Sequence, residues 1–210
     1  MKLSHEIAAA FLALILVILI IAPAAAEPVS PEALVKQVTG EVLDAIRKDK
    51  GLEAGDKRKA LALAEEKILP HVDFAEATRL AVGRTWSQAS PEQKEQLISA
   101  FRAMLVRIYS EAIDVYRGQT MRVLPTNAAP GVGDVIVRNQ YVRPGEPPVV
   151  IEYAMRRTAG GWKIYDIAVA GVSLVLTYRA EFDQVTRTEG IEGLLKRLRE
   201  KNRSRPSSMT

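Results

Sequence analysis

The apolar residues of this chain follow a helical period before Gly118 and an alternating period after it. Ahead of Gly118 they recur every three or four positions, which is typical of helices that bury one face. Beyond it, β-branched residues alternate with polar ones, which is typical of strands with one covered face. The change predicts an α+β fold in which the early helices cover an antiparallel sheet.

Start and stop signals divide the first part of the chain into four helices. Caps and breakers predict helices over 30–50, 56–69 and 73–83. The clearest start is Ser90, which is followed by proline at the first helical position and by a glutamine three residues on. The helix that begins there is expected to run over 91–117, about 40 Å at 1.5 Å per residue.

The second part predicts four strands and then closing helices. Alternation marks strands at 119–126, 134–142, 149–157 and 162–169, separated by glycine- and proline-containing turns that suit hairpins. A turn around Gly171 leads into a helix over 174–188 and a final basic segment. We find no internal repeat and no second domain boundary, so residues 27–204 are expected to form one domain, followed by a disordered polar end at 205–210.

The first 26 residues have the composition of a secretory signal. Lys2 precedes an apolar run at 7–22, and Pro23 and three alanines follow it, which predicts cleavage after Ala26. An uncleaved membrane anchor is the alternative, because the run is long and Glu6 opposes Lys2. Both interpretations place Glu27 onward outside the cytoplasm.

Charge and cysteine content exclude several classes of function. The net charge is +4, yet residues 27–190 hold 22 basic and 22 acidic residues, and residues 191–210 hold six and two. A balanced body argues against nucleic-acid binding. The absence of cysteine excludes disulfides, thiol nucleophiles and iron–sulfur clusters. The basic tail is either a solvated helix end or a surface that steers the protein toward anionic partners.

Acid–base chemistry has few candidates in the mature chain. His71 is its only histidine and lies near Asp73, but no nucleophile motif, metal-ligand spacing or phosphate-binding glycine pattern accompanies it. We therefore expect no enzyme activity, no catalytic residue, no metal and no cofactor.

A set of short motifs resembles the MlaC family of periplasmic phospholipid-binding proteins, also called toluene-tolerance or Tgt-type proteins. The most specific is Trp162-x-x-Tyr165-Asp166 with Gly171-Val172-Ser173. Further matching segments occur in order over essentially the whole mature chain: 69–72, Trp86, 89–94, 101–102, 116–120 and 187–194.

The resemblance implies a cone-like fold of the nuclear-transport-factor class, in which a curved sheet and helices enclose an apolar cavity for a phospholipid cargo. It implies a monomeric periplasmic shuttle between two membrane assemblies that keeps phospholipid out of the outer leaflet of the outer membrane. One assembly is an inner-membrane ABC transporter complex with a membrane-anchored lipid-binding subunit, and the other is an outer-membrane lipoprotein–porin complex. The residues expected to face the cavity are Leu105, Tyr109, Tyr153, Tyr165, Ile167, Val172 and Leu174.

Two positions depart from the family pattern, and two alternatives stay open. Ala170 stands where an acidic residue is common, and His71 stands where tyrosine is common. Some relatives handle hopanoids, so another apolar lipid is an alternative cargo. The same cone fold also hosts small-molecule isomerases and dehydratases, for which His71 with Asp73, or Asp166, are the candidate acid–base groups.

Overall fold

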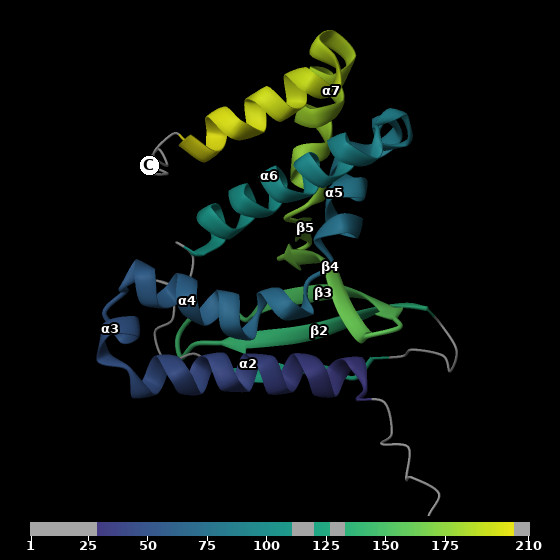
Figure 1. The fold of residues 1–210 in the computed structure, drawn as a ribbon. Coiled ribbons are helices and arrows are strands. Elements are labelled where there is room, and N and C mark those ends of the chain that lie inside the picture. The colour runs from purple at the N-terminus through teal and green to yellow at the C-terminus, as the bar shows by residue number, and fades with distance from the viewer. Residues whose placement is uncertain (1–28, 111–119, 127–132, 204–210) are drawn as a thin grey trace, which may run out of the picture.

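The computed structural model describes residues 29–110, 120–126 and 133–203, and the side chains of residues 109 and 110 are not described. Helices and an antiparallel sheet form two layers. Helices α2 and α4 lie along one face of the sheet, while α5, α6 and α7 form a separate helical group on one side of it (Figure 1). The α+β class, with helices packed on an antiparallel sheet, is therefore confirmed. The expected signal at 1–26 and polar end at 205–210 lie outside the described residues.

The first helices begin at the capping residues that the sequence indicates. The Ser30 hydroxyl accepts a hydrogen bond from the Ala33 N–H at 3.1 Å, and α2 runs over Pro31–Lys48. It ends earlier than expected because the Asp49 carboxylate caps a new short helix, α3 (Lys50–Glu53). Asp56 caps α4 (Lys57–Lys67), and a 3₁₀ turn, η2 (Leu69–His71), follows it.

The long helix begins with the reciprocal cap that the sequence predicts. Helix α5 (Phe74–Val82) and the 3₁₀ segment η3 (Gly83–Gln88) lead to α6 (Pro91–Ser110). The Ser90 hydroxyl accepts from the Gln93 N–H at 3.2 Å, and the Gln93 side-chain oxygen accepts from the Ser90 N–H at 3.0 Å. The expected continuation over 111–117 lies outside the described residues.

The sheet has five antiparallel strands in the order β1-β2-β3-β4-β5. They are β1 (Thr120–Val123), β2 (Asp134–Val142), β3 (Val149–Thr158), β4 (Gly161–Val169) and β5 (Val172–Ser173). β2, β3 and β4 match the predicted strands to within one residue, whereas β1 ends at Val123, before the predicted end at Thr126. The fifth was not predicted because two residues show no alternation. It forms because Ala170 and Gly171, with φ of 50° and 82°, turn the chain straight back.

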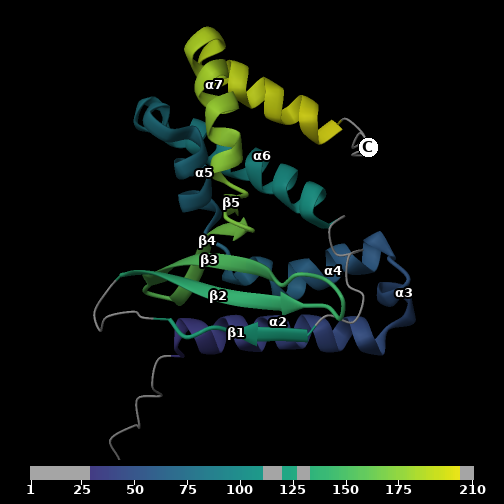
Figure 2. The ribbon, with the colours of Figure 1, turned by 180° about the vertical axis from the view of Figure 1, so that it is seen from behind.

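The two faces of the sheet differ in polarity. The inner face carries Val137 and Met155, which pack against Val35 of α2. The outer face, which Figure 2 shows in front of α2 and α4, carries ion pairs such as Arg138 with Glu152 at 2.7 Å. This division follows the alternation of the strand sequences.

Helix α7 (Arg179–Arg203) follows the 3₁₀ turn η5 (Leu176–Tyr178) and bends sharply at Gly190, where φ is 69° and ψ is −170°. Glycine adopts this backbone without the steric cost of a Cβ. The bend folds the second half of α7 back over α6 (Figure 1), where Arg199 donates to Gln96 at 2.7 Å. No helix in the described ranges combines the length and the apolar character that crossing a membrane requires.

Candidate functional site

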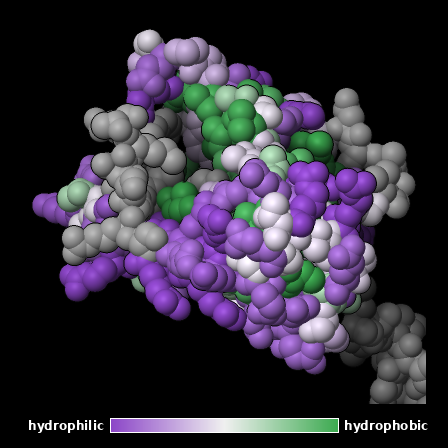
Figure 3. Space-filling model, turned by 90° about the horizontal axis from the view of Figure 1, so that it is seen from above, coloured by the Kyte–Doolittle hydropathy of each residue, from purple (hydrophilic) through white to green (hydrophobic). Residues whose placement is uncertain are grey.

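The buried apolar side chains of the described residues form separate clusters instead of one core. The helical cluster joins α5, α6 and α7, the sheet cluster joins β2, β3, β4 and α2, and a third, smaller cluster joins α2, α3 and α4. Domains of this size usually have one contiguous core. In the view from above, hydrophilic side chains cover most of the surface and hydrophobic ones show in hollows between them (Figure 3). The helical cluster consists of Ala77, Ala81, Val82, Ala89, Leu97, Phe101, Met104, Leu105, Val175, Phe182, Val185, Leu194, Leu195 and Leu198. The sheet cluster consists of Val35, Val135, Val137, Met155 and Ile164.

A row of apolar side chains continues the inner face of the sheet beyond the sheet cluster. Tyr153 of β3 lies opposite Ile167 of β4, and Ile151 lies opposite Val169. Cross-strand partners place their side chains on the same face. Met155 is fully buried, whereas these four are only half-buried. The protein therefore covers one end of this apolar face and leaves the other partly open.

The β4–β5 hairpin extends the same face. Val172 lies opposite Val169 in the register, and the N–H of Leu174 donates to the Ile167 carbonyl at 2.8 Å. Leu174 is half-buried, but Val172 is 61% exposed and has the greatest exposure among the large apolar residues of the described ranges. The hairpin thus carries an apolar side chain into solvent at the open end of the face.

A carboxylate fixes this hairpin from the other side. Asp166 accepts from the Ser173 hydroxyl at 2.5 Å and from the Val175 N–H at 3.2 Å, and the Ser173 hydroxyl oxygen accepts from the Leu176 N–H at 2.8 Å. Three hydrogen bonds therefore hold the turn that presents Val172.

The structure separates the remaining predicted site residues. Leu105 belongs to the helical cluster, across from the sheet, and the side chain of Tyr109 lies outside the described residues. Tyr165 occupies a bulge in β4, where the register shifts between Ala154 and Met155. Its ring lies 5.3 Å from the Arg156 guanidinium, on the outer face. Tyr165 therefore does not join Tyr153 and Ile167, because the bulge changes the direction in which it points.

Polar side chains under α2 form a feature that the sequence analysis missed. Asn139 is fully buried, and the Tyr141 and Tyr153 hydroxyls lie 3.3 Å apart. Burial, and then the neighbouring Tyr141, raise the pKa of Tyr153 well above its ordinary value, so the phenol stays neutral. The signal was present in β2, where Asn139 interrupts the inward-facing series of Val135 and Val137.

Two of the candidate acid–base residues, Asp73 and Asp166, are used for structure. Asp73 caps α5 by accepting from the Glu76 N–H at 2.9 Å, and Asp166 holds the hairpin. Burial, and then Lys163, lower the pKa of His71, which favours the neutral ring. In the described part of the chain, no group of three or more histidine, aspartate or glutamate side chains is arranged to hold a metal.

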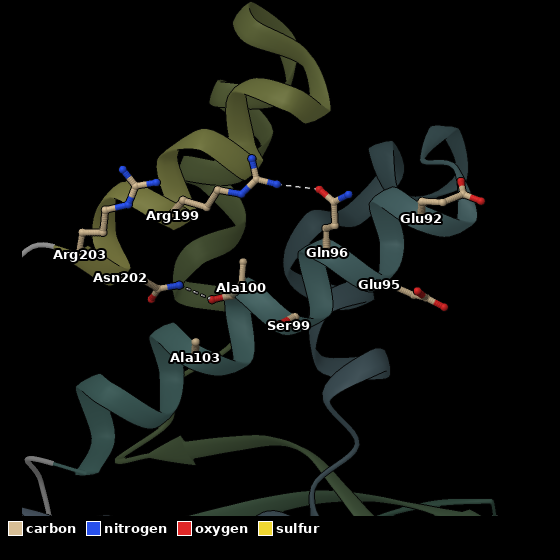
Figure 4. Close-up of a pocket in the computed structure, with 9 residues that line it drawn as sticks. All are labelled: Glu92, Glu95, Gln96, Ser99, Ala100, Ala103, Arg199, Asn202 and Arg203. Carbon is tan, nitrogen blue, oxygen red and sulfur yellow. Dashed lines mark hydrogen bonds between the residues drawn. The ribbon is translucent and has the colours of Figure 1, made fainter.

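A groove lies between α6 and the second half of α7, with a volume of about 610 Å³. Acidic side chains come from the first turns of α6, and basic ones come from the end of α7 (Figure 4). Its lining residues are Glu92, Glu95, Gln96, Ser99, Ala100, Ala103, Arg199, Asn202 and Arg203.

Part of the charge of the basic tail is already paired. Lys201 lies 2.8 Å from Glu181, and Arg197 lies 2.8 Å from Glu189. Arg199 contacts the neutral amide of Gln96 and keeps its charge unmatched there. Fewer charges of the tail are therefore available for long-range steering than the sequence suggests.

Comparisons with known proteins agree on one family. The model of the MlaC protein family matches residues 36–200. The Haemophilus influenzae "intermembrane phospholipid transport system binding protein MlaC" is 21% identical over 81% of this chain and 81% of its own length. The Pseudomonas putida "toluene tolerance protein ttg2D" is 23% identical over 77% of this chain and 75% of its own.

One solved structure is similar in both sequence and fold. It is a phospholipid-binding protein from Ralstonia solanacearum in complex with a phospholipid, with 38% identity and a TM-score of 0.74. The match covers 81% of this chain and 96% of that one.

Proposed function

The chain belongs to the MlaC family, and on this premise we propose that it is a periplasmic carrier that holds a phospholipid by its acyl chains while the lipid passes between two membranes. The 38% identical Ralstonia solanacearum protein, which has been solved with a phospholipid, supports this cargo. The names of the two curated relatives, one for intermembrane phospholipid transport and one for toluene tolerance, support the process.

The observation that carries the proposal is the division of the apolar interior. The helical cluster and the sheet cluster share no residue, and half-buried apolar side chains extend from the sheet cluster toward the β4–β5 hairpin. An apolar ligand that lies along this face would cover it. The arrangement needs no catalytic group, and Asp73 and Asp166 have structural partners instead.

The energetics of lipid transfer require such a cover. A diacyl lipid has roughly thirty methylene groups, and each costs about 0.8 kcal/mol to expose to water. Covered acyl chains cross an aqueous space without that cost. The bound acyl chains in turn cover the half-buried inner face of the sheet, so binding removes apolar surface of both the lipid and the protein from water.

Within this proposal the predicted residues take different places. Leu105 lies on the helical side of the acyl chains, and Tyr153, Ile167 and Leu174 lie on the sheet side. Val172, which is largely exposed, contacts the lipid at the open end of the face. Tyr109 stays in the proposed set, while Tyr165 acts from the outer face by packing under Arg156.

We assign the protein to a lipid transport route with three parts, which are an inner-membrane complex, this carrier and an outer-membrane complex. It receives or delivers lipid at an inner-membrane ABC transporter complex, through the membrane-anchored lipid-binding subunit of that complex. It exchanges lipid at an outer-membrane lipoprotein–porin complex, and the process maintains the asymmetry of the outer membrane. A signal at 1–26 directs the chain to the periplasm, where it acts as a monomer.

Mass spectrometry of lipid extracted from detergent-free protein tests the function. We expect diacyl phospholipid in substoichiometric to stoichiometric amount, and uptake from phospholipid vesicles by delipidated protein. Hopanoid without phospholipid would support the carrier function but change the identity of the cargo. Protein without any extractable lipid, and without uptake from vesicles, would overturn the carrier function.

A further inference from the structure

The groove between α6 and α7 has walls of opposite charge and a floor of small residues. Glu92 and Glu95 come from the first turns of α6, whereas Arg199 and Arg203 come from the last turns of α7 (Figure 4). Ser99, Ala100 and Ala103 lie between them. The floor is polar to weakly apolar, and so differs from the apolar inner face of the sheet.

The two helices that form the groove run parallel. Gln93 donates to Glu192 at 2.9 Å, Arg199 donates to Gln96 at 2.7 Å, and Asn202 donates to the Ala100 carbonyl at 2.9 Å. Residue numbers therefore rise together along both helices. Because parallel helices align their dipoles, a third helix is favoured when it lies antiparallel to both.

The charges of the groove select the same orientation. An antiparallel helix places its N-terminal turn beside Arg203 and its C-terminal turns beside Glu92 and Glu95, with Arg199 near the middle, beside Gln96. Acidic side chains are favoured in the first turn of a helix and basic ones in the last turn. Small floor residues let the helix approach to a normal interaxial distance of about 8–10 Å. The charge pattern of the groove thus complements the ordinary charge pattern of a helix.

We propose that this groove docks one amphipathic helix of a partner protein, antiparallel to α6 and α7, with acidic residues in its first turns and basic residues in its last turns. The helix spans at least the distance from Glu92 to Ala103, about 16 Å or three turns. Recognition is of the helix-in-groove kind. The proposal is independent of the phospholipid cargo, which lies on the inner face of the sheet.

Two synthetic peptides test the proposal by fluorescence anisotropy with the full mature protein. Each is an alanine-based helix of about 18 residues, roughly 27 Å long. One carries glutamates in its first two turns and lysines in its last two, and the other has these residues exchanged. We expect the first to bind severalfold more tightly at low salt, because the exchanged peptide matches the charges of the groove only when it lies parallel to α6 and α7, against their aligned dipoles. Equal affinity for both peptides would overturn the proposal.

Variants of the groove give the second arm of the test. The double variant Arg199→Glu with Arg203→Glu should abolish the preference between the peptides, because both ends of the groove are then acidic. Ala103→Arg, at an exposed position of the floor, should weaken both by about tenfold through steric exclusion of the helix. Ala62→Arg, at an exposed position of α4, is the matched control and should leave binding unchanged. Unchanged peptide binding by Ala103→Arg would place the site elsewhere and overturn the proposal.

Two further measurements distinguish other occupants. Lipid content and circular dichroism should be the same in all four proteins, since the groove is separate from the inner face. A wild-type dimer in sedimentation velocity that Ala103→Arg converts to monomer would identify a second copy as the occupant. Groove-dependent binding to zwitterionic vesicles without peptide binding would identify a lipid headgroup. Either result would overturn the partner helix.

Discussion

The carboxylate of Glu76 on α5 lies 2.9 Å from the guanidinium of Arg156 on β3. This ion pair links the helical group to the sheet, because Arg79 of α5 holds the same carboxylate at 2.6 Å and Asp134 of β2 holds Arg156 at 2.8 Å. Glu76 is only 8% exposed. The two parts of the protein, whose apolar clusters are separate, are thus joined by charge.

Glu76→Gln should lower the free energy of unfolding by about 1–2 kcal/mol, since a buried carboxylate with two partners becomes neutral and the partners stay exposed enough to recover hydration. Urea unfolding at pH 7 measures this. Glu65→Gln, at an exposed position, is the control and should have almost no effect.

The same pair should make stability depend on pH. The Arg79 hydrogen bond, above all, lowers the pKa of Glu76 below its ordinary value. The unfolded state therefore takes up the proton first as the pH falls. The stabilisation is present above the pKa of an unfolded glutamate, about 4.3, and is lost as the pH falls through the lower folded pKa. The difference between wild type and Glu76→Gln should shrink below about pH 4, and a constant difference would contradict this role.

Val169→Glu should reduce phospholipid content at least about tenfold in protein purified without detergent. A carboxylate among acyl chains is desolvated at a cost of several kcal/mol, whereas water can solvate it when the lipid is absent. Ile136→Glu is the matched control, because Ile136 is 45% exposed on the outer face. Loss of lipid in both variants, or in neither, would contradict the inner-face site. Val172→Glu, tested beside them, reports whether the lipid reaches the hairpin.

Ala170→Gly should raise the free energy of unfolding by about 0.5–1 kcal/mol. Ala170 is a non-glycine residue with φ of 50°, where the Cβ is strained and glycine is not. Ala168→Gly, two residues earlier in β4, should lower it by about the same amount because glycine weakens a strand. Thermal unfolding followed by circular dichroism distinguishes the two signs.

Gly40→Ala should stabilise the protein by about 0.5–1 kcal/mol, since Gly40 lies inside α2 and an added Cβ would meet no atom within 4 Å. Gly193→Ala in α7 should destabilise it, because the added Cβ would lie 2.2 Å from the Cβ of Glu189. Chemical denaturation of both variants separates helix propensity from crowding, and the same sign for both would contradict the analysis.

His71→Ala should leave phospholipid content and the rate of transfer between vesicles within about tenfold of wild type. His71 is a single half-buried side chain whose pKa burial lowers, and the nearby Asp73 is occupied as a helix cap. This substitution removes every histidine-dependent mechanism at once. Complete loss of function in a folded variant would favour an enzyme.

Local signals predicted most of the fold. Capping residues such as Ser90 and Asp56 predicted helix starts, and alternation predicted the span of β2 without error. Two misses, β5 and the bulge at Tyr165, share one physical cause, which is a structure shorter than the period that reveals it. The early end of α2 has another cause, because Asp49 caps a new short helix.

The site was less predictable because it depends on which strand face a residue occupies. Tyr153 and Ile167, both expected to face the cavity, lie opposite each other on the inner face, but the bulge turns Tyr165 to the outer face. Asn139 was missed, although a polar residue at an inward strand position is a visible signal. The groove between α6 and α7 depends on a bend that brings together helices distant in sequence.

We expect the helical cluster and the sheet cluster to belong to two separate cooperative units, which hydrogen exchange can resolve as segments that open independently. Within the proposed function, a bound phospholipid completes the missing contact between the units and acts as a core component supplied from outside. Lipid binding then couples the opening of the two units, and the hydrogen-exchange rates of amides in both units fall together. When the lipid is released, the two units again open independently, so the cooperativity of unfolding reports whether the carrier holds a lipid.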